Sequence, residues 1–245
     1  MKSKGILLKQ LLLIFVVVFS ISSCRTSIDF RGEKGNGTVV IQTRTITEKF
    51  EKIHVTSGIE LIVSQNDVVS VEVETDENIQ PLILTKVENG VLKITTDDSF
   101  DTSKSPQVRV SLPLVSGLKS SSGSNIKSGN TLKSTSLTVD SSSGSEIEID
   151  VEADFISMES SSGSSIGVRG KALKAETSSS SGSDIDASEL IANEVFSQTS
   201  SGSSTKVNPV LILNAKASSG SSINYKNIPK TLEKEESSGG SVSKY

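Results

Sequence analysis

The sequence predicts an all-β protein: a single-stranded β-helix, or solenoid, with rungs of about 19–20 residues. The first observation is a Ser/Gly core that recurs in residues 116–245, with steps of 21, 19, 19, 20, 18 and 19 residues between its glycines. The second is that apolar or small residues occupy the odd offsets from these glycines, and polar residues the even offsets. Self-similarity at this period indicates a solenoid, and strict alternation indicates strands with one buried face.

Each repeat has an apolar residue, or once a threonine, three positions after its glycine, and we expect this residue to point inward. The inward ladder predicted in this way is Ile126, Ile147, Ile166, Ile185, Thr205, Ile223 and Val242. The even offsets carry residues such as Glu146 and Glu148, which alternation places on the outer surface. One repeat cannot bury its apolar face alone, whereas rungs stacked about 4.8 Å apart bury it continuously.

The Ser/Gly cores are expected to form ordered corners between strands. Such runs are typical of flexible linkers, but a linker has no reason to keep an isoleucine in register with its glycines. Serine is small and can hydrogen-bond to backbone or to a serine one rung away, while glycine adopts angles closed to other residues. We expect these corners to be too narrow inside for large side chains. The repeat-corner glycines are Gly58, Gly123, Gly144, Gly163, Gly182, Gly202, Gly220 and Gly239.

The region before the regular repeats is predicted to belong to the same domain, which spans residues 38–245. Residues 50–63 alternate like a rung and contain Gly58 with the parity of the later corners. Further strands are expected at 69–75, 82–87 and 108–112. Residues 38–115 are therefore expected to form divergent N-terminal rungs. No window after the signal peptide has a 3.6-residue apolar period, so essentially no helix is expected.

The first 23 residues have the features of a lipoprotein signal peptide. Lysines precede the apolar run 11–19, which is too short to span a bilayer comfortably. Residues 21–24, Ile-Ser-Ser-Cys, resemble the bacterial lipobox, whose cysteine is acylated and becomes the mature N-terminus. We therefore expect lipidation, including palmitate, at Cys24, followed by a flexible tether over 24–37. Cys24 is the only cysteine, so no intramolecular disulfide can form.

The order of motifs along the chain resembles a known family. Residues 50–61 (Phe-Glu-Lys-Ile-His-Val-Thr-Ser-Gly-Ile-Glu-Leu), 87–94 (Val-Glu-Asn-Gly-Val-Leu-Lys-Ile) and 110–113 (Val-Ser-Leu-Pro) are followed by serial Ser-Gly-Ser repeats. This order resembles the head GIN domain family, labelled "putative auto-transporter adhesin", whose members occur widely as exported bacterial lipoproteins. The resemblance covers roughly residues 46–243. It implies a right-handed β-helix and supplies no catalytic residues.

Composition argues against several classes of partner. Without residues 1–23 the chain has 22 basic and 29 acidic residues, so its net charge is 22 − 29 = −7. This charge argues against nucleic acid as a partner and against electrostatic binding to an anionic membrane surface. The chain has no tryptophan and two tyrosines, fewer than platforms that stack sugars or bases would need.

Motifs that might carry chemistry are weak. Residues 163–167 match the nucleophile-elbow pattern G-x-S-x-G, but the sole histidine, His54, lies upstream and the segment is one copy of a repeat. His54 falls on the outward parity and is expected to be solvated. Outward acids such as Glu148 and Asp186 could offer oxygens to calcium, but Gly167 interrupts their row. We therefore expect no catalytic residues, no metal and no cofactor, although calcium binding by these acids stays open.

These features favour a non-enzymatic, lipid-anchored envelope protein whose polar β-helix surface binds a macromolecule, either a polysaccharide or a protein. This interpretation covers an adhesin-like module or an envelope scaffold. The alternative is a structural spacer or self-assembling element that associates through its terminal rungs, and a polysaccharide-acting enzyme is the third class. We expect export to the outer membrane. The periplasmic face is favoured over the cell surface because the segment after Cys24 lacks an acidic run that resembles a surface-export signal.

Overall fold

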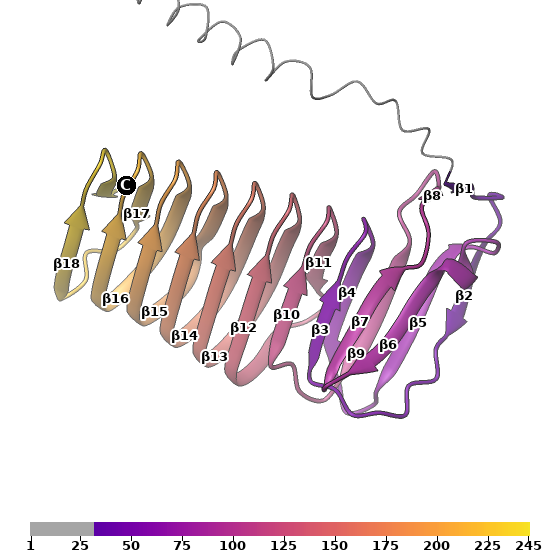
Figure 1. The fold of residues 1–245 in the computed structure, drawn as a ribbon. Coiled ribbons are helices and arrows are strands. Elements are labelled where there is room, and N and C mark those ends of the chain that lie inside the picture. Colours follow the sequence, from indigo (N-terminus) through magenta and orange to yellow (C-terminus); the bar gives the residue numbers. More distant parts are fainter. Residues whose placement is uncertain (1–31) are drawn as a thin grey trace, which may run out of the picture. The chain divides into compact units, whose positions relative to one another are not determined.

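The structure, a computed structural model, describes residues 32–245, and these residues form a β-helix. Residues 1–31, with the predicted signal peptide and Cys24, lie outside the described part of the chain. A 17-stranded sheet folds around one apolar core (Figure 1). The described residues contain no α-helix, only the short 3-10 turn η1 (Gln80–Leu82). The predicted all-β solenoid is confirmed.

Five strands of the solenoid are long, and four of them run from one Ser/Gly corner to the next. In β13 (Glu146–Ser160) the alternation of inward and outward residues breaks at Asp154 and Phe155, where the chain turns from one face of the solenoid to the other. The residues of β13 before this bend follow the Gly144 corner, and the residues after it lead to the Gly163 corner. The other long strands are β12 (Leu132–Ser141), β14 (Ser165–Ser179), β15 (Asp184–Thr199) and β16 (Ser204–Ala217).

The solenoid therefore has two faces, which we name by their strands. Face 1 comprises β7 (Val91–Thr96), β3 (Lys52–Val55), β10 (Gly117–Ser120), the C-terminal halves of β12 to β16, and β18 (Thr231–Glu236). Face 2 comprises β9 (Gln107–Leu112), β4 (Glu60–Gln65), β11 (Asn125–Ser128), the N-terminal halves of β13 to β16, β17 (Ser222–Tyr225) and β19 (Ser241–Lys244). All of these strands pair in parallel. In Figure 1, face 1 is the row of arrows that rises to the upper turns.

The corners combine two residues in the left-handed region with buried hydroxyls. At one corner Ser143 has φ 55° and Gly144 has φ 69°, the positive pair of a type I′ turn. The Gly144 N–H donates to the carbonyl of Ser162 in the next rung (3.2 Å). Below the turn, the hydroxyls of Ser141 and Ser145 are buried and lie 2.9 Å apart. The Ser145 hydroxyl donates to the carbonyl of Ser120 in the previous rung (2.8 Å).

One corner differs from the expectation that the interior there is too narrow for large side chains. At the Gly58 corner, Val55 and Ile59 occupy the places that serines hold at the Gly123, Gly144, Gly163 and Gly182 corners, and both are fully buried. The turn itself is unchanged, because Ser57 has φ 66° and Gly58 has φ 70°. The left-handed dipeptide therefore makes the corner. The serines satisfy backbone groups and do not merely fit a narrow space.

The core lies between the two faces. Aliphatic residues that point inward stack from rung to rung, as Ile126, Ile147 and Ile166 do in direct register. Each of these side chains is at most 1% exposed. Because the rungs are in register, each apolar side chain is covered by its counterparts in the rungs on both sides. This removes it from water and stabilises the array through nearest-neighbour contacts.

The N-terminal part corrects the expectation that residues 38–115 consist only of divergent rungs. Strands β3 and β4 make one rung, and β7 and β9 pair with them in parallel. In contrast, β5 (Ser70–Asp76) pairs antiparallel with β9, β2 (Val39–Thr43) antiparallel with β5, and β6 (Ile83–Glu88) antiparallel with β7. The turn at Asn89 and Gly90, both with positive φ, reverses the chain into a hairpin. Antiparallel strands thus close this end of the solenoid.

The order of rungs in space differs from their order in the sequence. The rung of β3 and β4 lies between that of β7 and β9 and that of β10 and β11. In sequence order, the chain therefore first forms the rung of β3 and β4, which is second in space. It then forms the terminal rung of β7 and β9, and it passes to β10 through residues 113–116. From β10 onward, order in space and in sequence agree.

Residues 33–37 also differ from expectation, because they are not a free tether. Strand β1 (Glu33–Lys34) pairs in parallel with β8 (Phe100–Asp101). A Cβ on Gly32 would lie 2.8 Å from the amide nitrogen of Phe100, and a Cβ on Gly35 would overlap the Asp76 carboxylate. These glycines permit close packing of backbone, whereas the sequence suggested that they give flexibility.

The C-terminal end leaves the edges of β18 and β19 open. All six residues of β18 are exposed. Lys234 and Glu236 stand where inner rungs have inward-pointing residues, and their side chains pair with each other (3.5 Å). The Glu236 carboxylate accepts the N–H of Val242 at 2.7 Å. Charged side chains at a strand edge discourage further pairing.

Among residues 32–245, no helix is long and apolar enough to cross a membrane.

Candidate functional site

Outward side chains form rows, because successive rungs keep their register. Ion pairs join adjacent rungs along these rows, at distances from 2.6 to 3.6 Å. The six pairs are Lys119–Asp140, Lys127–Glu148, Lys133–Glu152, Arg169–Asp150, Lys206–Asp186 and Lys216–Glu235. Exposed pairs of this kind contribute little to stability, but opposite charges directly across two strands favour this register over a shifted one. The rows are interrupted at two glycines, and a hollow forms at each.

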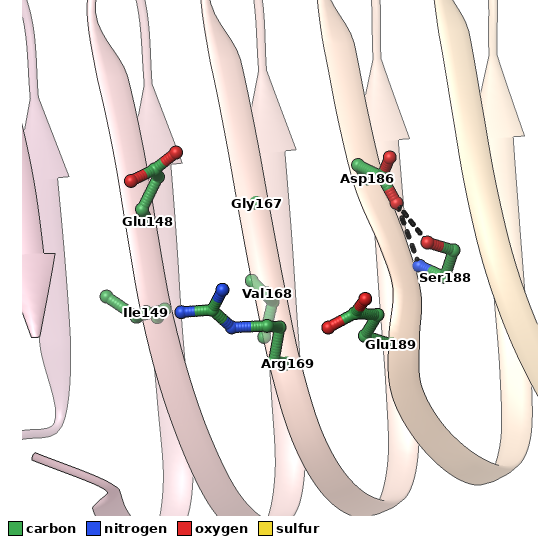
Figure 2. Close-up of a pocket in the computed structure, with 8 residues that line it drawn as sticks. All are labelled: Glu148, Ile149, Gly167, Val168, Arg169, Asp186, Ser188 and Glu189. Carbon is green, nitrogen blue, oxygen red and sulfur yellow. Dashed lines mark hydrogen bonds between the residues drawn. The ribbon is translucent and has the colours of Figure 1, made fainter.

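The first hollow lies on face 2 at Gly167. Its volume is about 250 Å³. Figure 2 shows Glu148 and Asp186 on either side of Gly167, with Arg169 and Glu189 below them. Most of these charges already have partners, since the Arg169 Nε is 2.9 Å from Asp150 Oδ1 and Asp186 is 3.2 Å from the Lys206 ammonium.

The titration of these groups reflects the pairing. Hydrogen bonding and charge from Asp150 raise the pKa of Arg169. Burial raises the pKa of Asp186, but hydrogen bonds from Ser188 and the Lys206 ammonium outweigh it and leave this pKa below its usual range. Within residues 32–245, no group of three or more acidic, histidine or cysteine side chains is arranged to hold a metal ion. The geometry at Gly167 therefore gives no support for a calcium site.

The second hollow lies on face 1 at Gly117 and is larger, about 400 Å³. Gly117 stands in a row between Lys52 and Thr138. A Cβ on Gly117 would lie 2.9 Å from Thr138 Oγ1 and 3.1 Å from Lys52 Cγ, so a side chain there would displace these two neighbours. The Gly117 φ is not in the left-handed region, and its role here is spatial.

A row of titratable side chains borders this hollow. Lys93, His54 and Lys119 hold equivalent positions in three successive rungs, followed by Asp140 and Glu159 in the next two. Lys119 is paired with Asp140 at 2.6 Å, and Lys93 with Glu88 at 2.5 Å. Lys52 makes no ion pair with any residue of 32–245. The hollow thus has a basic end and an acidic end.

His54 lies on face 1, on the outward parity that the sequence predicts, but it is only half exposed. Its Nε2 is 3.2 Å from Ser121 Oγ in the next rung. Burial and the nearby Lys119 charge lower the pKa of His54, while Asp140 acts in the opposite direction. The imidazole is therefore neutral near pH 7.

An aromatic end continues the hollow towards β15. The Lys174 ammonium lies 5.5 Å from the ring centre of Phe155 and 4.7 Å from that of Phe196, within the range of cation–π attraction. A further hollow of about 330 Å³ is lined by Phe196 and shares Ser157 and Glu159 with the hollow at Gly117. The two hollows are neighbours on face 1 on either side of Ser157 and Glu159, and we call them together the face 1 groove.

The structure places the predicted residues as follows. The corner glycines all have positive φ between 68° and 79°. The residues of the inward ladder are all buried, with exposures of at most 4%. In the G-x-S-x-G segment, the motif serine is Ser165, a half-buried residue at the start of β14 on face 2, in register with Glu146 and Asp184. The lipidation site Cys24 lies outside the described residues.

The face 1 groove is the feature that sequence reasoning missed. Aligning the residues six positions before each corner glycine would have given Lys52, Gly117, Thr138, Ser157, Glu176, Phe196, Asn214 and Glu233. In that row Gly117 is the one position without a side chain, and Phe196 is the one aromatic residue.

Comparison with known proteins identifies the same architecture elsewhere. A family model described as "Putative auto-transporter adhesin, head GIN domain" matches residues 49–229. A search of curated proteins gives no match.

Solved structures of three bacterial proteins share the fold. A putative adhesin from Bacteroides fragilis has a TM-score of 0.81 and 18% identity, over 87% of this chain and 100% of its own. A putative adhesin from Parabacteroides merdae has a TM-score of 0.70 and 20% identity, over 86% and 98%. A putative lipid binding protein from Parabacteroides distasonis has a TM-score of 0.69 and 18% identity, over 86% and 98%.

Proposed function

The chain belongs to the family described as "Putative auto-transporter adhesin, head GIN domain", and we propose that it is a non-enzymatic, lipid-anchored protein of the cell envelope. Its role is to bind another macromolecule on the outer surface of the β-helix, as an adhesin-like or scaffold module. The family suggests an exported envelope protein, and the residues that precede the fold suggest how it is held there.

The observation that carries the proposal is the face 1 groove. It crosses the strands β7, β3, β10, β12, β13, β14 and β15, so seven neighbouring strands of one sheet position its side chains. A surface built on stacked strands is rigid before the partner arrives, which lowers the entropic cost of binding. Extended solenoid faces suit large and repetitive partners.

The chemistry of the described residues supports binding over catalysis. His54 is the sole histidine of the chain, and among residues 32–245 its ring bonds to the Ser121 hydroxyl and to no carboxylate. A nucleophile–base pair normally has a third group that orients the base. The serine of the G-x-S-x-G segment, Ser165, lies on face 2, whereas His54 lies on face 1.

The anchor of this proposal is Cys24, with its acyl chains in the outer membrane. Support comes from the run Ile-Ser-Ser-Cys at 21–24 and from the apolar segment before it. The periplasmic face is favoured over the cell surface, since the residues after Cys24 include no acidic run.

The proposal is tested in two measurements on the same protein. Cys24→Ala should abolish incorporation of labelled palmitate and shift the protein from the membrane to the soluble fraction. Acylation or unchanged fractionation of the variant would contradict the anchor.

The purified Cys24→Ala protein should then bind saturably to isolated envelope fractions while it stays monomeric in light scattering. Self-association without envelope binding would favour the spacer alternative. Trypsin added to intact cells reports the location, because cleavage only after the outer membrane is permeabilised is expected for a periplasmic protein.

A further inference from the structure

We propose that the face 1 groove binds an acidic glycan, with the carboxylate or sulfate groups of the sugar chain at its basic end and a pyranose ring against Phe196. The inference rests on the proposed binding function and names the ligand class of that same site. It follows from the charge, the shape and the aromatic edge of the groove.

The basic end fits anions that repeat along a polymer. Lys93 and Lys119 lie on either side of His54 in adjacent rungs, so they are two strand spacings, about 10 Å, apart. That spacing is comparable to the length of two pyranose units. Lys52 stands beside this row and has no ion-pair partner among residues 32–245, so its ammonium is available to an anion. Charge-assisted hydrogen bonds from lysine to an oxyanion are among the stronger polar contacts.

The middle of the groove fits sugar hydroxyls. Gly117 adds no side chain to it, and the hydroxyls of Thr138 and Ser157 line it together with the carboxylates of Asp140 and Glu159. Hydroxyl side chains both donate and accept, and carboxylates accept. A polyhydroxylated chain offers both donors and acceptors at this position.

The aromatic end fits the apolar face of a sugar ring. Phe196 is an outward aromatic side chain that stays 36% exposed although the Lys174 ammonium lies 4.7 Å from its ring centre, and the neighbouring hollow is also lined by Glu176 and Gln198. An exposed ring between polar side chains provides an apolar surface at a wet site. The hollows of about 400 and 330 Å³ lie on either side of Ser157 and Glu159, which gives room for a short oligosaccharide.

The experiment titrates the mature lipoprotein in detergent micelles with an oligogalacturonide, its uncharged methyl ester and a sulfated maltooligosaccharide. Calorimetry should show binding of the oligogalacturonide and none of the ester. Binding by the sulfated sugar as well would identify the negative charge as the recognised group. Its absence would identify the carboxylate.

Two pairs of matched variants locate the site. Gly117→Thr fills the face 1 groove, and Gly167→Thr adds the same side chain to the equivalent gap on face 2, where a Cβ has more room. Lys52→Gln removes the available ammonium, and Lys127→Gln removes an exposed ammonium that is paired with Glu148 on face 2. Loss of one charge-assisted hydrogen bond predicts weakening of about tenfold or more for the Lys52 variant. Circular dichroism checks that each variant folds. If Gly117→Thr does not fold, the comparison of Lys52→Gln with Lys127→Gln tests the location of the site.

The outcomes separate this inference from the proposed function. Weakening by both face 1 variants and by neither face 2 variant supports it. Equal weakening by the face 2 variants, or equal binding of the methyl ester, overturns it. If no acidic oligosaccharide binds while the protein still binds envelope fractions, the ligand class is wrong and the binding function stands. If envelope binding is absent as well, the proposed function fails with it.

Discussion

Gly144 and Gly170 test two separate reasons for glycine in this fold. Gly144 lies in a corner with φ +69°, and a Cβ built on it would have no atom within 4 Å. Gly170 lies in β14 with φ +118°, and its Cβ would overlap the carbonyl oxygen of Val151 and lie 3.0 Å from the carbonyl carbon. The first needs glycine for its backbone angle alone, whereas the second also needs it for space.

The expected costs differ for this reason. Gly144→Ala should lower the free energy of unfolding by about 1–2 kcal/mol, the cost of a left-handed L-residue. Gly170→Ala meets a comparable conformational cost, and in addition β14 must move away from β13 where Gly170 pairs with Val151. Disturbing that pairing should bring the total to about 3 kcal/mol or more.

Urea unfolding followed by far-UV circular dichroism measures both values, with the wild type as reference. Equal m-values are required for the comparison, because a changed slope would mean that part of the array unfolds separately. Gly117→Ala, which has no positive φ, serves as a further reference for a crowded glycine. A cost for Gly144→Ala equal to that for Gly170→Ala would refute the assignment of the corner cost to backbone angle alone.

Three further predictions concern the core, the pH dependence and the C-terminal edge. Ile147→Asp places an unpaired charge at a position that is 0% exposed and should lower the free energy of unfolding in urea by several kcal/mol. The exposed Glu148→Lys should change it by about 0.5 kcal/mol or less. Equal shifts of the two urea midpoints would contradict the assignment of Ile147 inward and Glu148 outward. Because burial and Lys119 lower the pKa of His54, the unfolded chain binds this proton first. Stability should therefore fall as pH drops below about 6.5, and His54→Gln should lose less between about pH 7 and pH 5; an unchanged slope would count against this. Replacing Lys234 with Val and Glu236 with Ile removes the charges at the open end and should produce oligomers in light scattering, so a variant that stays monomeric at high concentration would speak against the edge role.

The rungs could be predicted because side-chain parity is local information. Ile147 and Glu148 differ by one position, and alternation alone assigns them to opposite sides of the strand. The direction of pairing is not encoded in this way. Strand β5 alternates as the rungs do, yet it pairs antiparallel with β2 and β9, since direction depends on the turns and on what each strand packs against.

The candidate site was harder to predict because it depends on the order of rungs in space. Lys93 and Lys119 lie 26 positions apart in sequence, and both flank His54 only because the rung of β3 and β4 lies between theirs. The hollow itself lies at Gly117, which has no side chain. Gly117 lies outside the corner pattern, so the alignment of the repeat corners gives no reason to single it out.

The crossover at residues 113–116 gives the two ends of the molecule different freedom to change length. On its N-terminal side, β3 and β4 are held between two rungs that come later in the chain, so an added or deleted repeat there would break the arrangement. On its C-terminal side each repeat touches only its neighbours. Duplicating a segment such as 203–220, one step of the repeat, would extend the solenoid by about 4.8 Å without altering the face 1 groove or the N-terminal end. The length of this protein is therefore a trait that unequal recombination between repeats can adjust, one strand spacing at a time.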